Sequence, residues 1–102
     1  FVSLHAPLAG GELITKPFTF NGSKVHLNVS TSAAGSVKVE IRQPDGKVIP
    51  GFSLDDCEEI YGDDLDRQVI WKSGADLATL QGVPVRLRIA VKDGDVYSFV
   101  FN

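Results

Sequence analysis

The stretch that decides the fold is VPVRLRIAVKDGDVYSFVF, residues 83–101. Every second residue of its first half is apolar: Val85, Leu87, Ile89 and Val91. This period of two is typical of a strand that buries one face. Asp93-Gly94 follows, a dipeptide that favours a hairpin turn because both of its positions tolerate a positive φ. The stretch therefore predicts two antiparallel strands, the second with Tyr97, Phe99 and Phe101 on one face.

The same alternation recurs upstream. Residues 24–32 and 36–43 each alternate apolar and polar side chains, and the short link Ser32–Gly35 predicts a second hairpin between them. The first third is also extended, with strand-like segments at residues 1–6 and 11–20, and RQVIWK, residues 67–72, predicts a further strand. The only helical candidate is residues 74–82, which is short and which Asp76 can cap.

Short strands, frequent turns and almost no helix indicate an all-β protein. We expect an antiparallel β-sandwich, jelly-roll-like, of about eight strands with one short helical turn. A length of 102 residues fits one domain over residues 1–102. The chain begins at Phe1 and holds no methionine, so we expect a module excised from a larger protein.

The net charge of −3 comes from one local feature. Seven of the thirteen carboxylates lie between Asp55 and Asp66, and the rest of the chain has more basic than acidic residues. Without a basic stripe we expect no nucleic-acid partner. No apolar run approaches the ~20 residues that span a bilayer, so we expect no membrane insertion. A single cysteine forms no intrachain disulfide and leaves the cellular compartment open.

The acidic stretch is SLDDCEEIYGDDLDRQVIW, residues 53–71. Calcium takes six to eight oxygen ligands, which this stretch could supply. A structural calcium is therefore the one possible cofactor. The candidate metal ligands are Asp55, Asp56, Asp63 and Asp64. Their spacing does not follow the alternating pattern of an EF-hand loop. The alternative is a solvated connection between strands, partly neutralised by basic side chains.

Catalysis is not expected. Paired carboxylates need a dry cleft, which a small sandwich has little material to build. Asp56 and Glu58 flank Cys57 and disfavour its thiolate, so Cys57 is expected to point inward. His5 and His26 form no zinc-binding spacing.

Carbohydrate binding needs exposed aromatic rings with planar polar side chains beside them. The candidate residues are Trp71, Tyr61, Phe52, Arg86, Arg88 and Asp76. The competing interpretation places the rings in the core. Trp71 alternates with Val69, and Tyr97 with Phe99, which favours inward packing.

Several short pieces carry a family resemblance that covers nearly the whole chain: Gly51-Phe52-Ser53-Leu54, Asp56-Cys57, Gly62-Asp63, Trp71-Lys72, Leu80-x-Gly82, Val85-Arg86-Leu87-Arg88 and Tyr97-Ser98-Phe99. They resemble a C-terminal β-sandwich module of secreted bacterial glycoside-hydrolase-like proteins with a five-bladed propeller, like families 32 and 43. The sequence departs from the pattern at Ile89-Ala90-Val91, where an aromatic residue is expected.

The resemblance implies a non-catalytic accessory role in a secreted or periplasmic protein, because catalysis in such proteins is assigned to the propeller. No catalytic residue is carried over to this chain. We expect a carbohydrate-binding module with a polysaccharide as partner. The alternative is a structural module that stabilises a neighbouring catalytic domain without binding sugar.

Overall fold

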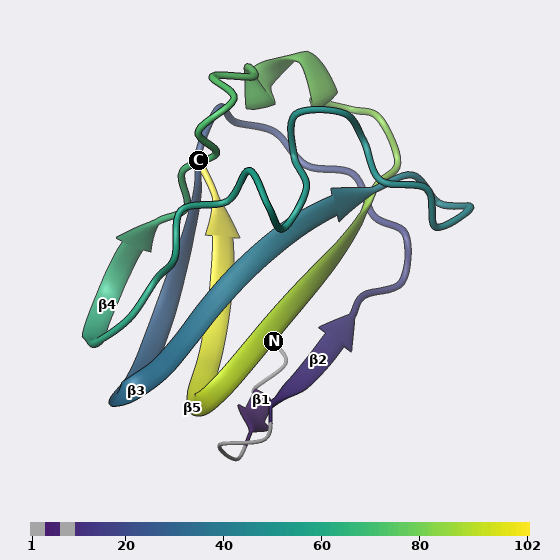
Figure 1. Ribbon diagram of the computed structural model, residues 1–102. Helices are drawn as coiled ribbons and strands as arrows, with labels where there is room; N and C mark the ends of the chain where they lie inside the picture. Colours follow the sequence, from purple (N-terminus) through teal and green to yellow (C-terminus); the bar gives the residue numbers. More distant parts are fainter. Residues whose placement is uncertain (1–3, 7–9) are drawn as a thin grey trace.

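The computed structural model describes residues 4–6 and 10–102 (Figure 1). Its elements are β1 (Leu4–Ala6), β2 (Gly11–Ile14), β3 (Val25–Arg42), β4 (Asp63–Gln68), the 3₁₀ turn η1 (Leu77–Leu80) and β5 (Arg86–Phe101). The strands form one antiparallel sheet in the order β1-β5-β3-β4, with β2 also paired to β5. The all-β class and the short helical turn are confirmed. The jelly-roll-like sandwich of about eight strands is wrong, because this part of the chain forms a single open sheet.

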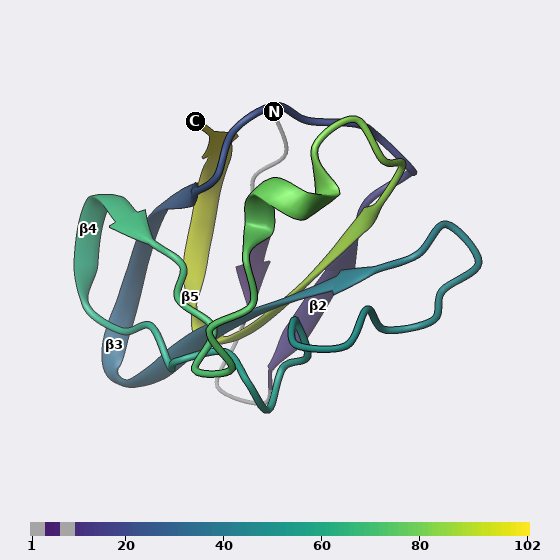
Figure 2. The same ribbon diagram turned by 90° about the horizontal axis from the view of Figure 1, so that it is seen from above.

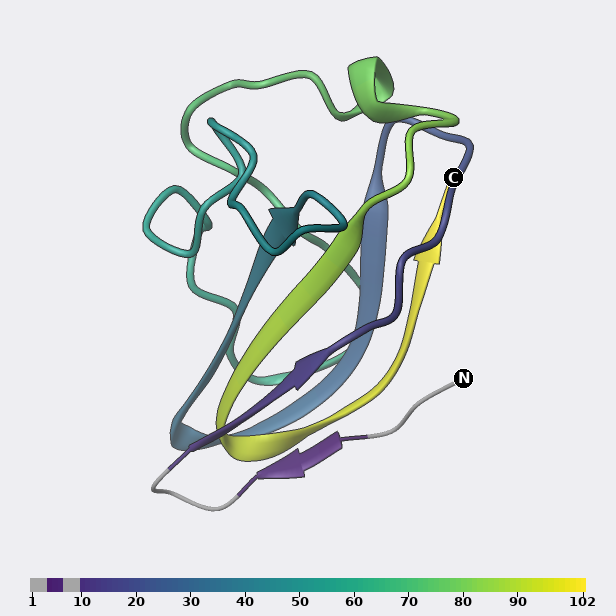
Figure 3. The ribbon, with the colours of Figure 1, turned by 90° about the vertical axis from the view of Figure 1, so that its right-hand side faces the viewer.

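The two hairpins expected at residues 32–35 and 93–94 are bends within two long strands. β3 has 18 residues and β5 has 16, and they pair with each other from Val25↔Phe101 to Arg42↔Arg86. In a hairpin, the two halves of β3 would pair with one another, whereas here each half pairs with β5. Figures 1 and 3 show both strands folding back at the same corner. Residues 32–35 and Asp93-Gly94 thus mark changes of direction, as expected. The predicted hairpins are wrong, because β3 and β5 pair with each other.

The corner requires close contact between backbones. The pairing register shifts between Thr31 and Ser36, and Asp93 is the one non-glycine residue of the described chain with a positive φ, 46°. A Cβ on Gly35 would lie 2.4 Å from the carbonyl oxygen of Asp93, and one on Gly94 would lie 2.7 Å from that of Ser30. Only glycine fits at these two positions without displacing the neighbouring strand.

The bend creates two arms whose inner faces enclose the core. Arm A comprises residues 25–31 of β3 and 94–101 of β5, with β1 and β4 beside them. Arm B comprises residues 36–42 of β3 and 86–92 of β5, with β2 beside them. The alternating apolar residues expected to face inward are buried: Val25, Leu27, Val29, Val37, Val39, Ile41, Val85, Leu87, Ile89 and Val91.

A bulge corrects the prediction for the last strand. Phe99 pairs with Leu27, but Val96 rather than Tyr97 pairs with Val29, so β5 holds one extra residue. The extra residue changes which side chains face inward. Val96 is 2% exposed and Tyr97 is 46% exposed, so Tyr97 does not share the inner face with Phe99 and Phe101.

Irregular segments close the open sides of the core. Phe18 pairs with Val85 at the β5 side, and Phe20 stacks on Phe101 with ring centroids 4.1 Å apart. At the β3 side, the connection between β3 and β4 pairs Ile60 with Val37. The turn η1 lies across the open end between the arms (Figure 2). Asp76 caps this turn as expected, since its carboxylate accepts a hydrogen bond from the Ala78 amide at 3.0 Å.

A Gly35→Ala substitution tests the corner. The added methyl group meets backbone on the opposite strand, so we expect a loss of about 1–3 kcal/mol in the free energy of unfolding, measured by urea denaturation. Ala33→Ser, at an exposed position of the same bend, is the control and should change stability by less than about 0.5 kcal/mol. A Gly35→Ala protein as stable as the wild type would contradict the close approach.

Candidate functional site

Cys57 and Trp71 of the acidic stretch provide hydrogen-bond partners for the backbone at the edge of β3. The two residues form an antiparallel bridge, in which the Glu58 amide donates to the Ile70 carbonyl at 2.8 Å. Together they serve the backbone of Val39. Its amide donates to Cys57 Sγ at 3.4 Å, and its carbonyl accepts from Trp71 Nε1 at 3.0 Å. Two side chains thus replace a neighbouring strand at a buried point of the edge, where an unpaired backbone group would be costly.

Two of the residues considered for sugar binding are core residues. Trp71 is 8% exposed and Phe52 is 2% exposed. Their rings meet edge to face, with centroids 5.2 Å apart. The Phe52 carbonyl also accepts a hydrogen bond from the Ile41 amide, at 2.9 Å. Neither ring therefore presents a face to solvent on which a sugar could stack.

Three further candidates are held by structural contacts. Arg86 donates from Nε to the Pro44 carbonyl at 2.9 Å and from Nη1 to the Thr15 carbonyl at 3.3 Å. Arg88 pairs with Glu12 at 2.7 Å and with Glu40 at 3.3 Å. Its hydrogen bond to Glu12 is the main reason that the pKa of this guanidinium is raised above its ordinary value. Asp76 caps η1.

Trp71 and Asp76 nevertheless line one shallow groove. It has a volume of 340 Å³, and Lys24 and Gln68 contribute planar or charged polar groups to its wall. The groove thus combines two of the six residues that the sequence predicts for sugar binding. Tyr61, Phe52, Arg86 and Arg88 do not line it.

Tyr61 lies at an adjoining depression, which shares Gln68 and Ile70 with this groove. Its side chain is 61% exposed, and Ile70, at 47%, lines the same 230 Å³ hollow. The remaining lining residues are Glu58, Glu59, Ile60, Arg67 and Gln68. An aromatic and an aliphatic side chain are therefore exposed side by side, with charged and amide groups around them.

The four proposed calcium ligands are not gathered at one point. In the described part of the chain no three His, Cys, Asp or Glu residues form a group able to hold a metal ion. Asp63 accepts from Ser30 Oγ at 2.6 Å, Asp56 accepts from Ser53 Oγ at 3.1 Å, and Asp64 accepts from the Asp66 amide at 2.9 Å. Asp55 is exposed.

β4 starts within the acidic stretch, earlier than the strand expected at residues 67–72. It lies at the end of the strand order, with Asp63 and Asp64 paired to β3. Carboxylates on an edge strand oppose pairing with another chain, which gives these acids a structural role. Asp66 also lies 2.8 Å from Nδ1 of His26 on β3, within ion-pair distance when the imidazole is protonated.

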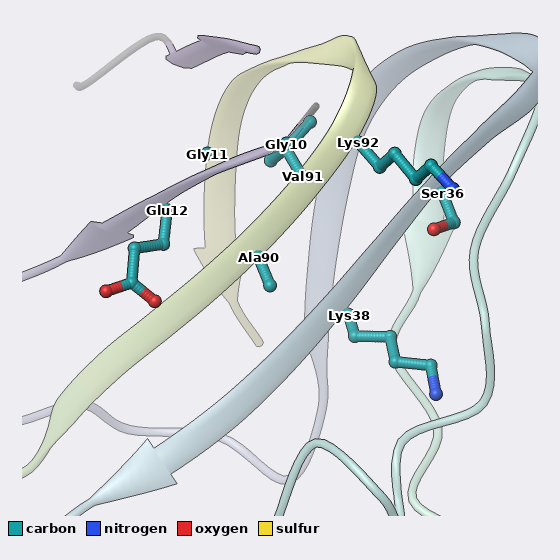
Figure 4. A pocket seen from close by; sticks show the side chains of 8 residues that line it. All are labelled: Gly10, Gly11, Glu12, Ser36, Lys38, Ala90, Val91 and Lys92. Atoms are coloured by element: carbon teal, nitrogen blue, oxygen red, sulfur yellow. The ribbon is translucent and has the colours of Figure 1, made fainter. Parts of the chain in front are cut away.

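A further hollow lies on the outer face of arm B and was not found from the sequence (Figure 4). It has a volume of 420 Å³ and spans β2, β5 and β3. We call it the outer groove, and its lining residues are Gly10, Gly11, Glu12, Ser36, Lys38, Ala90, Val91 and Lys92. The alternation of Lys38 with Val37 and Val39 predicts that Lys38 faces outward. Its proximity to Lys92 follows from the pairing of β3 with β5, which the two expected hairpins do not include.

Cys57 is inert in the folded chain, as expected from its inward position. It is 0% exposed, and burial is the largest of the effects that raise the pKa of its thiol. A nucleophilic cysteine requires the opposite shift. The thiol also donates to the Glu58 carbonyl at 3.4 Å.

Trp71→Phe tests whether the indole supports β3. The ring is largely retained, but the buried Val39 carbonyl loses its donor, so we expect a loss of about 1–3 kcal/mol in the free energy of unfolding. The matched control is Tyr61→Phe, which alters an exposed ring and should cost less than about 0.5 kcal/mol. Equal stabilities of the two variants in urea denaturation would show that the Trp71 hydrogen bond contributes nothing.

Cys57→Ala tests the buried thiol through pH. The unfolded thiol ionises near pH 8.5, whereas the folded thiol has a raised pKa and keeps its proton to higher pH. Ionisation therefore stabilises the unfolded wild type first, and the wild type loses stability as pH rises above about 8.5. Cys57→Ala lacks this loss.

We expect the wild type to be more stable than Cys57→Ala at pH 7, because the Val39 amide loses its acceptor in the variant. The difference in the free energy of unfolding between the two proteins should narrow between about pH 8.5 and 10. Other titrating groups are common to both proteins and cancel in the comparison. The free energies of unfolding are measured by urea denaturation. A difference between the two proteins that stays constant from about pH 8.5 to 10 would refute the burial of the thiol.

One depression and two grooves are thus the candidate sites: the Tyr61 depression, the outer groove, and the groove lined by Trp71 and Asp76. No helix in the described residues is long and apolar enough to cross a membrane. No protein-family model, curated protein or solved structure matches this chain. The assignment of function therefore rests on its own residues.

Proposed function

We propose that the chain is a non-catalytic structural module that docks against a neighbouring domain. The observation that carries the proposal is that the fold itself occupies most of the residues that the sequence predicts for sugar binding. Trp71 and Phe52 fill the core, Arg86 and Arg88 tie strands and loops together, and Asp76 caps η1. Five of the six are occupied by the fold itself, which favours a scaffold over a sugar platform.

The Tyr61 depression is the docking surface in this proposal. Binding hot spots are enriched in tyrosine and lie in apolar centres with a polar rim. Tyr61 and Ile70 supply the centre, and Glu58, Glu59 and Gln68 supply the rim. Burying Tyr61 and Ile70 against a partner would remove apolar area from water without disturbing the core.

The resemblance of the sequence to modules of propeller-type glycoside hydrolases implies a place beside a catalytic domain in a secreted or periplasmic protein, and we include this place in the proposal. The partner would then be that domain, and the chain would need no cofactor of its own. The acidic residues in contact with serine hydroxyls and backbone amides also act locally, which fits a module without catalysis.

Carbohydrate binding is the second candidate, because Trp71 and Asp76 line one groove with Lys24 and Gln68. The edge of the indole and three polar side chains would contact a sugar there. This site would be weaker than a platform of exposed rings, since Trp71 is only 8% exposed.

Hydrogen exchange in the longer parent polypeptide tests the docking role. We expect the amides of residues 58–62 and 67–71 to exchange more slowly in the parent than in the isolated chain, because the docked partner excludes water from them. The double substitution Tyr61→Ala and Ile70→Ala should abolish this difference. It should cost the isolated chain less than about 1 kcal/mol, since both side chains are exposed.

Leu65→Ala is the matched control, because Leu65 is 84% exposed and does not line the depression. Equal exchange in the two contexts would overturn docking at this surface. Affinity electrophoresis against plant, algal and fungal polysaccharides addresses the second candidate. Retardation that Lys24→Ala removes and Tyr61→Ala leaves intact would establish the sugar groove instead, because Lys24 lines that groove and not the depression.

A further inference from the structure

The outer face of arm B carries an ordered row of charges. Glu12, Arg88, Glu40 and Arg42 alternate in sign, with ion pairs of 2.7, 3.3 and 3.2 Å between successive members. Glu40 is 4% exposed and lies between the two guanidinium groups. Each carboxylate of the row is compensated by at least one arginine, so the row adds no net charge to this face.

The outer groove beside this row holds two lysines without a partner. Among residues 10–102, no side chain forms an ion pair or hydrogen bond with Lys38 or Lys92. The Ser36 hydroxyl likewise has no bonding partner in that part of the chain. Glu12 lines the groove too, but Arg88 neutralises it. The groove is therefore positively charged.

The register of the sheet explains how the groove forms. Ala90 pairs with Lys38 on one side and with Glu12 on the other, and Lys92 pairs with Ser36. The methyl group of Ala90 is too short to fill the space between its long neighbours, and Gly10 and Gly11 leave the β2 side open. In Figure 4, Lys92 and Lys38 both extend from the groove toward the β3 side, with the ammonium group of Lys92 close to Ser36.

We propose that the outer groove binds an acidic side chain of a partner protein, seated on Ala90 between Lys38 and Lys92. The carboxylate of a glutamate would reach the Lys92 ammonium group and the Ser36 hydroxyl, and Lys38 would add a second positive charge on the same side of the groove. Its aliphatic stem would cover the apolar floor. An acidic polysaccharide is the less suitable occupant, because the groove has no aromatic ring on which a sugar could stack.

This inference is independent of the docking role assigned to Tyr61, because the outer groove and the Tyr61 depression share no residue. It adds a second contact surface of opposite charge. A partner that used both would need an acidic group for the outer groove and an apolar group for Tyr61. Each surface can be removed by substitution without altering the other.

Titration with hexa-L-glutamate, followed by ¹H–¹⁵N correlation spectra at low salt, tests the proposal. We expect shifts in the amides of residues 36–38 and 90–92, reduced at high salt because the charges are exposed. Lys38→Gln with Lys92→Gln should weaken binding about three- to tenfold. Lys16→Gln with Lys47→Gln removes the same net charge from two other exposed lysines and should leave the affinity within about twofold.

Trigalacturonate serves as the carbohydrate probe in the same titration. Shifts at the groove that are larger with trigalacturonate than with hexaglutamate would overturn the assignment to a protein partner. Equal weakening by both pairs of lysine substitutions would show a general charge effect and would also overturn it. Unchanged circular dichroism and unfolding midpoints of the variants ensure that a loss of binding is not a loss of fold.

Discussion

The corner at Gly35 and Gly94 is the constraint on which the structure depends. β3 and β5 are long strands, and they bend where two backbones can approach without side chains between them. The bend turns one sheet into two facing arms and lets a single pair of strands supply most of the core. Because both strands bend together, the ladder between them is interrupted between Thr31 and Ser36 and resumes beyond the corner, so that each half of β3 pairs with β5.

A bent sheet leaves the outer edge of β3 to be paired, and this need explains the acidic stretch. Its cysteine and tryptophan satisfy the amide and the carbonyl of Val39, and Ile60 pairs with Val37. The acids between them occupy a solvated connection and the edge strand β4. A segment that resembles a metal loop or a sugar site in composition thus covers the edge of the sheet, with Cys57, Ile60, Val69 and Trp71 buried and the carboxylates at the surface.

The sequence predicts the alternation, the all-β class, the capped turn at Asp76 and the inward position of Cys57, because these features depend on neighbours in the chain. It does not predict the connectivity. Asp93-Gly94 suits a hairpin and a tight corner equally well, since both require a positive φ. The bulge that turns Tyr97 outward and the register that brings Lys38 near Lys92 depend on pairing between distant residues. Trp71 illustrates both cases. Its alternation with Val69 predicts burial, whereas its hydrogen bond to the Val39 carbonyl could be found only from the structure.

The pairing of both halves of β3 with β5 is the central claim, and nuclear Overhauser contacts test it most directly. We expect cross-strand backbone contacts between Leu27 and Phe99 in arm A and between Val39 and Ile89 in arm B. Two separate hairpins would instead give contacts between residues 25–31 and 36–42, and between residues 86–92 and 95–101. The first set of contacts without the second is the result that the bent sheet predicts, and the second set without the first would contradict it.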